Sequence, residues 1–220
     1  MTSRTELENL GEFGLIDKLT GQIQLVQEST ILGVGDDSAV IKPGESLVLV
    51  TSDMLLEGIH FDLSYSPLKH LGYKAVAVNV SDIAAMSGTC TQITVNLGLS
   101  NRFSLEAVEE LYQGVMAACS SYQCDLVGGD TTSSRSGLTI SVTAIGTVDP
   151  ENLVKRSGAK EYDLICVSGD LGAAYMGLQV LEREKQVFLA DSEMQPELDA
   201  YEYIVGRQLK AEARVDVVEW

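Results

Sequence analysis

The chain is poor in basic residues. Fifteen lysines and arginines stand against 32 aspartates and glutamates in 220 residues, which gives a formal net charge of −17. Proteins that bind nucleic acids or anionic membrane surfaces usually carry clustered lysine and arginine. No basic stripe of that kind occurs in this sequence. We therefore expect no nucleic-acid partner and no membrane partner.

Paired cysteines and long apolar runs are also missing. The four cysteines form no C-x-x-C pair, and the first residues contain no apolar signal-peptide core. No apolar run approaches the roughly 20 residues that cross a bilayer. These absences predict a cytoplasmic protein whose cysteines are reduced and buried.

Several familiar catalytic motifs are absent as well. The sequence has no GxxxxGK[ST] phosphate loop, no HExxH zinc motif, no GxSxG nucleophile elbow and no protein-kinase HRD motif. The Gly33-Val34-Gly35 turn is not followed by the third glycine of a dinucleotide-binding loop. The common nucleotide-binding and hydrolytic classes are therefore excluded on motif grounds.

What is present is the composition and patterning of a mixed α+β protein, with 45% apolar residues. The segment 68–86 is ambiguous, because its valines alternate as in a strand while its length and one apolar face favour a helix. The patterns predict strands over 30–41 (with a turn), 46–51, 92–99, 125–127, 138–148 and 164–168, and helices over 6–19, 68–86, 105–122, from about 172, and from about 196 to the end. The break at Asp149-Pro150 and the polar stretch after it predict a domain boundary.

Aspartates stand at four places where a strand or an apolar segment meets small residues. These places are Gly35-Asp36-Asp37, Thr51-Ser52-Asp53, Ser81-Asp82 and Gly129-Asp130. Asp82 lies inside the apolar stretch 75–86, where an ionised carboxylate must be paired or bound to a cation. Magnesium prefers oxygen ligands and bridges carboxylates to phosphates. From spacing alone, two interpretations stay open: a metal–phosphate site, or a set of unrelated helix caps and turns.

Six sequence blocks, taken together and in this order, resemble thiamine-monophosphate kinases of the aminoimidazole ribonucleotide synthetase-like superfamily. The blocks are GEFGLI (11–16), GVGDDSAVI (33–41), TSDMLLEGIHF (51–61), GYKAVAVNVSDIAAM (72–86), GGDTT (128–132) and KRSGAK (155–160). A single block such as GDD would be unspecific. The long 51–61 block favours the thiamine branch over the other superfamily members, and no cysteine precedes Cys90, which argues against selenophosphate synthetase.

The resemblance implies a fold and a domain arrangement. It implies a mixed α/β N-terminal domain over 1–148, with a mainly antiparallel sheet and flanking helices, that binds metal and ATP and dimerises by pairing sheets. It implies a linker over 149–162 that carries a phosphate-contacting arginine. Residues 163–220 would begin a second α/β domain, incomplete because the chain stops before the later acidic cluster of that family. A homodimer is the implied state.

The resemblance also implies site residues. Those that correspond to magnesium ligands are Asp37, Thr51, Ser52, Asp53, Asp82 and Asp130. Those that correspond to nucleotide contacts are Tyr112, Gly129, Asp130 and Arg156, and His60 corresponds to a substrate contact. Asp36 stays open between a ligand and a turn residue. Each assignment has a purely structural alternative. Tyr112 could be a surface residue, His60 a core histidine, Arg156 a solvated charge in the linker, and Gly129 part of a tight turn.

The implied reaction transfers a phosphoryl group from ATP to thiamine monophosphate, with Mg²⁺ held by aspartates and by direct in-line attack. The acceptor phosphate has a second pKa of about 6, so it is largely anionic at neutral pH and no catalytic base is expected. A covalent aspartyl phosphate is the mechanistic alternative. Two other functions stay open: a related superfamily synthetase acting on another small molecule, and a non-catalytic ATP-binding fragment.

Overall fold

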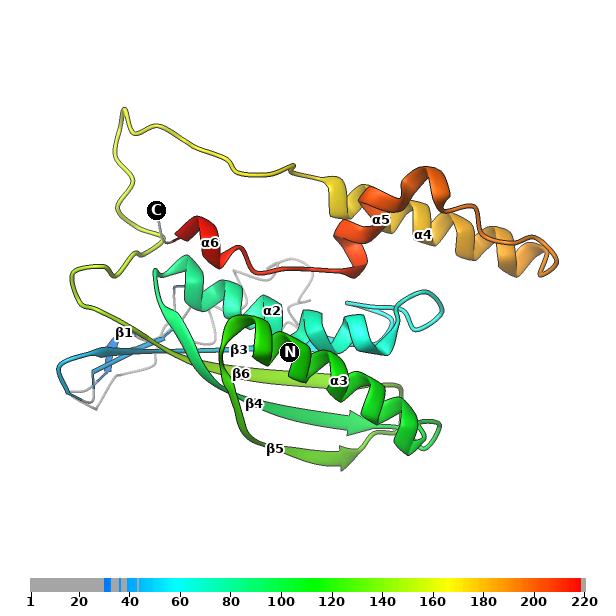
Figure 1. Ribbon diagram of the computed structural model, residues 1–220, viewed down its shortest axis with the longest axis horizontal. Helices are drawn as coiled ribbons and strands as arrows, with labels where there is room; N and C mark the ends of the chain where they lie inside the picture. Colours follow the sequence, from blue (N-terminus) through cyan, green and yellow to red (C-terminus); the bar gives the residue numbers. More distant parts are fainter. Residues whose placement is uncertain (1–29, 33–35, 37–38, 43, 219–220) are drawn as a thin grey trace, which may run out of the picture.

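Figure 1 shows the computed structural model, which describes residues 30–32, 36, 39–42 and 44–218. The helix expected over 6–19 and the expected ligand Asp37 lie outside these residues. Within the described ranges, none of the helices combines the length and the apolar character that crossing a bilayer requires.

Six strands in the described part of the chain form one sheet. In chain order they are β1 (Thr30–Leu32), β2 (Ala39–Ile41), β3 (Leu47–Leu56), β4 (Thr89–Leu99), β5 (Asp125–Ser133) and β6 (Thr139–Val148). Their order across the sheet is β1-β2-β3-β6-β4-β5, and only the β4–β5 pair is parallel. Parallel neighbours need a crossover connection, which α3 (Leu105–Tyr122) provides. The expected mainly antiparallel sheet with flanking helices is confirmed.

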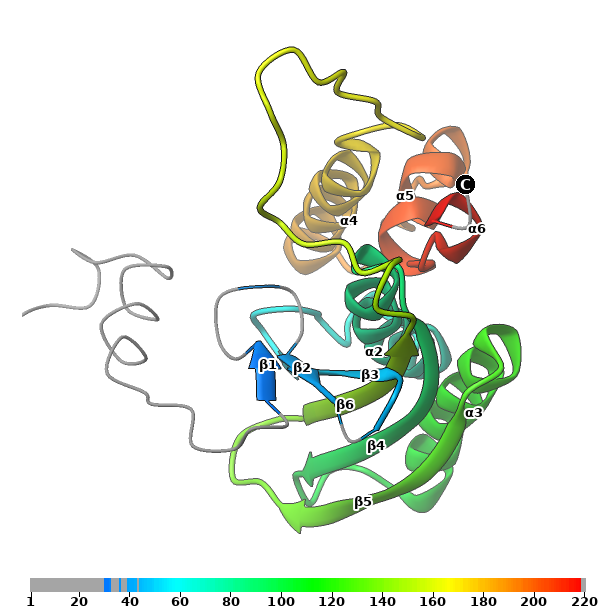
Figure 2. The ribbon, with the colours of Figure 1, turned by 90° about the vertical axis from the view of Figure 1, so that its left-hand side faces the viewer.

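The helices form two layers on one side of this sheet. The inner layer is α2 (Leu68–Ala85) and α3, which lie side by side against the sheet (Figure 1). The outer layer lies beyond α2, on the side away from the sheet (Figure 2). It contains α4 (Ala173–Ala190), the short 3-10 helix η2 (Asp199–Tyr201), α5 (Glu202–Leu209) and α6 (Val215–Val218).

The strands alternate between a helix-covered face and an open face, as the period of two in a strand requires. On β3, the side chains of Leu49 and Leu55 are buried on the covered face, while Met54, which points to the other face, is 54% exposed. On the neighbouring β6, Val142 is buried on the same covered face. One face of the sheet therefore builds the main core, and no helix among the described residues covers the other face.

β3 and β5 continue well past their predicted ends, and this extension places two of the predicted motifs inside strands. β3 continues to Leu56 because it pairs with β6 along its whole length, so Ser52 and Asp53 lie within the strand and not after it. β5 continues through Gly128, Gly129 and Asp130 because it pairs with β4 there. The expectation of a glycine turn at that motif is wrong.

The C-terminal part departs further from the predicted elements. Residues 164–168 form no strand: Leu164 is 90% and Ile165 is 94% exposed, and the described part of the chain offers them no strand partner. The predicted last helix is interrupted between α5 and α6, where Ala213 packs into the main core and its N–H donates to the Tyr122 hydroxyl, 2.9 Å away.

Val180, Leu181 and Val205 form a second, smaller hydrophobic cluster between α4 and α5. This cluster is separate from the main core, which agrees with a change of packing unit after β6. The domain limits 1–148, 149–162 and 163–220 remain a proposal.

α2 and α3 cross at very short range because each contributes a glycine to the contact. A β-carbon on Gly114 would lie 1.9 Å from the carbonyl oxygen of Lys69, and one on Gly72 would lie 2.0 Å from that of Leu111. Real β-carbons essentially never approach another heavy atom closer than 3.0 Å. Neither position can take a side chain unless the helices separate.

We expect Gly114→Ala to lower the free energy of unfolding by about 1–3 kcal/mol, because the helices must shift to accept the methyl group. Urea unfolding followed by circular dichroism measures the change. Gly206→Ala in α5 is the control, because no atom lies within 4 Å of its added β-carbon. The control should be neutral or slightly stabilising, since alanine favours a helix over glycine. Equal effects in the two variants would contradict the packing argument.

Candidate active site

Three of the predicted site residues meet where β3 passes beneath α2. Thr51 and Asp53 lie on the helix-covered side of β3, and Asp82 lies on α2. The Thr51 hydroxyl donates a hydrogen bond to a carboxylate oxygen of Asp82, 2.8 Å away. Two segments 31 residues apart in sequence are thus joined through groups that the sequence analysis selected.

Asn79 is a member of this group that the sequence analysis missed. Its side chain is fully buried, accepts the Asp53 backbone N–H at 3.0 Å and donates to the Ala75 carbonyl oxygen at 3.0 Å. β2 pairs only with residues 48–50 of β3, so the outer edge of β3 beyond that point is not covered by β2. Asn79 satisfies the Asp53 amide there. An asparagine three residues before an aspartate, in an apolar helix, was the available signal.

The Asp53 carboxylate itself has no hydrogen-bond or ion-pair partner among the residues that the structure describes. Its neighbour Ser52 points to the open face, where its hydroxyl lies 3.0 Å from the Thr143 hydroxyl and donates to the Val142 carbonyl oxygen. The Ser52 side chain therefore lies on the opposite face of β3 from the Asp53 side chain.

Asp36 and Arg156 join two other motifs. The backbone N–H of Arg156 donates to both carboxylate oxygens of Asp36 at 3.3 Å, and its guanidinium Nε lies 3.9 Å from one of them. The Asp36 side chain is only 7% exposed, whereas that of Arg156 is 53% exposed. Asp36 therefore holds the linker segment in place and leaves much of the arginine side chain accessible.

Gly129 and Asp130 are not part of the β3–α2 group within one chain. β6 and β4 lie between β3 and β5, and neighbouring strands are about 4.8 Å apart, so the separation along the sheet is about 14 Å. Asp130 is exposed and pairs in register with Asn96, on the face opposite Asp53. In the described ranges, no three acidic, histidine or cysteine side chains are grouped closely enough to hold a metal ion.

Gly129 has a structural requirement of its own. A β-carbon there would lie 1.8 Å from the Val95 carbonyl oxygen, and its φ is +155°. The sheet therefore needs glycine at this position whether or not a nucleotide binds.

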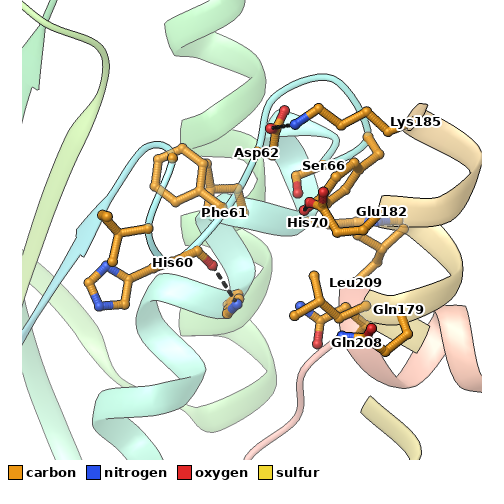
Figure 3. Close-up of a pocket in the computed structure, with 16 residues that line it drawn as sticks. His60, Phe61, Asp62, Ser66, His70, Gln179, Glu182, Lys185, Gln208 and Leu209 are labelled. Carbon is orange, nitrogen blue, oxygen red and sulfur yellow. Dashed lines mark hydrogen bonds and ion pairs between the residues drawn. The ribbon is translucent and has the colours of Figure 1, made fainter. Parts of the chain in front are cut away.

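The two aromatic candidates lie elsewhere. Tyr112 is half-buried on α3 and packs against the main core. His60 is exposed in the turn after β3, and its Nδ1 accepts the Leu56 backbone N–H at 3.0 Å. In Figure 3 its ring points away from the other labelled residues, while its carbonyl oxygen accepts a hydrogen bond from Lys74 at 3.3 Å. The assignments of Tyr112 and His60 as contacts stay predictions.

A cavity of about 370 Å³ separates the turn that carries His60 from α4 and α5 (Figure 3). Its lining mixes apolar side chains with charged and polar ones. Two contacts between lining residues connect the turn region to α4: Asp62 with Lys185 at 2.5 Å, and the Tyr65 hydroxyl with Glu182 at 2.5 Å. Burial and the nearby Glu182 raise the pKa of Tyr65. These long-range pairs had no signal in the sequence, because only the packing of α4 brings them together.

Asn79→Leu should lower the free energy of unfolding by about 1–3 kcal/mol, because the buried Asp53 amide loses its acceptor. Denaturant unfolding measures the effect. Asn101→Ala is the control, since Asn101 is exposed in a loop. If both variants unfold at the same denaturant concentration, Asn79 does not fix the strand.

Asp62 should make acid stability depend on Lys185. Burial tends to raise the pKa of Asp62, but hydrogen bonds from Lys185 and Ser64 outweigh it and lower the pKa to about 2. A depressed carboxylate pKa contributes stability above its ordinary pKa of 3.8, and this contribution is lost as the pH falls towards 2.

Because the pair is partly exposed, we expect a loss on the order of 1 kcal/mol over that window. Unfolding curves between pH 5 and 2, at steps of about half a unit, should show this loss in the wild type. Asp62→Asn should lack it, and Lys185→Met should reduce it. An identical acid profile for the wild type and Asp62→Asn would contradict the assignment.

Comparison with known proteins agrees with this architecture. Residues 35–148 match the family described as AIR synthase related protein, N-terminal domain. The chain is 37% identical over 214 residues to the thiamine-monophosphate kinase of Aquifex aeolicus (strain VF5), which covers 97% of this chain and 63% of that protein. It is 33% identical over 209 residues to the thiamine-monophosphate kinase of Bacillus subtilis (strain 168), covering 94% and 62%.

Solved structures give the same result. AaThiL complexed with AMPPCP and TMP superposes with a TM-score of 0.84 at 33% identity, over 99% of this chain and 64% of that one. The thiamine-monophosphate kinase from Stenotrophomonas maltophilia K279a gives 0.69 at 33% identity, over 95% and 64%. This chain thus spans a little under two thirds of the length of these relatives. The chain belongs to the AIR synthase-related protein family, and over nearly its whole length it is similar to the thiamine-monophosphate kinases of that family.

Proposed function

We propose that this chain is part of a cytoplasmic, magnesium-dependent enzyme that transfers the γ-phosphoryl group of ATP to thiamine monophosphate, giving thiamine diphosphate and ADP. The observation that carries the proposal is the Thr51–Asp82 contact beside the Asp53 carboxylate. It is supported by the similarity to a structure complexed with AMPPCP, an ATP analogue, and with TMP.

The donor set fits magnesium. The groups near the β3–α2 contact are the carboxylates of Asp53 and Asp82, the Thr51 hydroxyl and the Ser52 carbonyl, all of them oxygen donors, which Mg²⁺ prefers. In the proposed set they act together with Asp37 and Asp130. When bound, Mg²⁺ neutralises charge on the two phosphate groups and favours their in-line approach.

The chain's own groups have distinct tasks in this proposal. Thr51 orients one oxygen of Asp82, and Asn79 fixes the backbone of β3 so that the Asp53 carboxylate keeps its position. Arg156, held through its backbone by Asp36, directs its guanidinium to a nucleotide phosphate. Tyr112 and Gly129 are the other proposed nucleotide contacts, and His60 the proposed contact with thiamine monophosphate. No residue need act as a base, because the attacking phosphate is already anionic.

We also propose a homodimer in which the open faces of two sheets pack together. Apolar side chains on the uncovered face support it: Met54 is 54% and Val127 is 58% exposed. Asp130 lies on this open face and is remote from Asp53 of its own chain. In such a dimer, Asp130 would face the second subunit.

The test is a coupled ADP-release assay with thiamine monophosphate and Mg²⁺, run on this chain and on a fusion that adds the remaining C-terminal region of a relative. Asp53→Asn and Asp82→Asn should each reduce turnover of the active form by a factor of 100 or more, on the order of several kcal/mol of lost electrostatic stabilisation. The matched control, Asp149→Asn, changes an exposed aspartate outside the group and should keep activity.

Thermal unfolding without metal separates a chemical role from a structural one. Removing a carboxylate that holds a cation relieves repulsion, so the midpoints of Asp53→Asn and Asp82→Asn should rise or stay level. A large drop would mean that these residues are structural. Turnover of a different phosphate acceptor, with none of thiamine monophosphate, would end the assignment of the substrate.

A further inference from the structure

A lysine without a counter-charge borders the cavity between the His60 turn and helices α4 and α5. Lys74 lines this cavity of about 370 Å³, and within the described part of the chain it has no ion-pair partner. Its one hydrogen bond goes to the His60 carbonyl oxygen at 3.3 Å. Burial lowers the pKa of Lys74, because the ammonium group is partly removed from water. A charge in such a place is costly unless an opposite charge approaches it.

Further polar groups without partners line the same cavity. His70 lies one turn before Lys74 on α2, so the two side chains leave the same face of the helix. The Nδ1 atom of His70 is buried and makes no hydrogen bond to any described residue. The side chains of Ser66, Gln179 and Gln208 likewise have no hydrogen-bond partner among those residues. Gln179 on α4 and Gln208 on α5 belong to the wall opposite the turn (Figure 3).

The acidic side chains of the lining already have partners. Asp62 contacts Lys185, and Glu182 accepts the Tyr65 hydroxyl. The two carboxylates offset the charges of the two lining lysines in number, but neither lies within ion-pair distance of Lys74. The cavity therefore offers mainly hydrogen-bond donors to a ligand, and the nearby Glu182 favours a ligand of low negative charge.

The cavity is open to solvent and separate from the candidate active site. Ile59, which lines it, is 76% exposed. Thr51, Asp53 and Asp82 are not among its lining residues, and the His60 ring points away from it (Figure 3). Its volume lies within the range of about 300–1,000 Å³ that is typical of small-molecule sites.

We propose that this cavity binds a small oxyanion, the carboxylate or phosphate group of a metabolite, through the ammonium group of Lys74. The Ser66 hydroxyl and the amides of Gln179 and Gln208 would donate to the other oxygens of the ligand. Hydrogen bonds between an ammonium group and an anionic oxygen are among the stronger ones in proteins. The bound anion would connect α2 to α4 and α5, the helices that form the two sides of the cavity.

Thermal unfolding with added anion tests the proposal. The chain is titrated with sodium acetate and, separately, with sodium phosphate, in EDTA and with sodium chloride keeping the ionic strength constant. Without a divalent cation the aspartates of the β3–α2 group repel anions, so the result does not depend on the proposed kinase activity. We expect acetate, phosphate or both to raise the unfolding midpoint by about 2–4 °C along a saturating curve. Exclusion of phosphate from the protein surface would give a rise that does not saturate.

Four variants complete the test. Lys74→Met should remove the saturating rise, while Lys74→Arg, which retains the charge, should keep it. Lys69→Met is the matched control, because Lys69 is exposed on the same helix and does not line the cavity. Gln208→Met, on the opposite wall, should weaken the apparent affinity by about three- to tenfold and serves as the readout if Lys74→Met does not fold.

The comparison of acetate with phosphate decides which oxyanion the cavity prefers, and saturation by either supports the proposal. The proposal is overturned if neither anion gives a saturating rise with the wild type. A saturating rise that survives in Lys74→Met, that disappears in Lys69→Met, or that is unchanged in Gln208→Met would also overturn it.

Discussion

α2 lies between the sheet and the outer helices (Figure 2), so the polar side chains that it buries need partners inside the protein. Two polar residues of α2 find their partners on β3. Asn79 accepts a hydrogen bond from the backbone N–H of Asp53, and Asp82 accepts one from the Thr51 hydroxyl. The remaining candidate chemistry depends on this contact. These two hydrogen bonds hold β3 against α2, with the Asp53 side chain on the same face of the strand as Thr51.

The close crossing of α2 and α3 also helps to position α2. Gly72 and Gly114 let the two helix backbones approach so closely that not even a β-carbon would fit between them. α2 also packs on the sheet over β3 and β6. A looser crossing would need larger side chains in the inner layer. The close backbone contact with α3 therefore helps to hold the helix that carries Asp82.

The outer layer is attached differently. Its own hydrophobic cluster is small. The layer contacts the first unit through two polar pairs, Asp62 with Lys185 and Tyr65 with Glu182, and through Ala213, which packs into the main core. In the segment before α4, the side chains of Leu164 and Ile165 are almost fully exposed, and that of Val167 is largely exposed. Partly exposed polar pairs of this kind contribute less to stability than the continuous main core does.

The sequence alone determined the elements with strong periodicity and clear ends. α3, with Ser104 at its N-cap, follows from the spacing of its apolar residues, and α2 follows from its length. The family blocks determined the fold type and selected Thr51, Asp53 and Asp82 before any contact was known. Local pattern and side-chain chemistry are encoded over a few residues, so these features can be read from the chain.

Only the tertiary structure decided which of those residues meet. The extension of β3 and β5 depends on strands paired from distant parts of the chain, so the sequence placed Ser52 and Gly129 in turns where the sheet continues. The hydrogen bond from Asp53 to Asn79 and the contact of Asp36 with Arg156 both join segments that are distant in the sequence, and the strand order alone separates Asp130 from Asp53. Such contacts are fixed by the order of strands and by the seating of helices on them, and no local spacing records either.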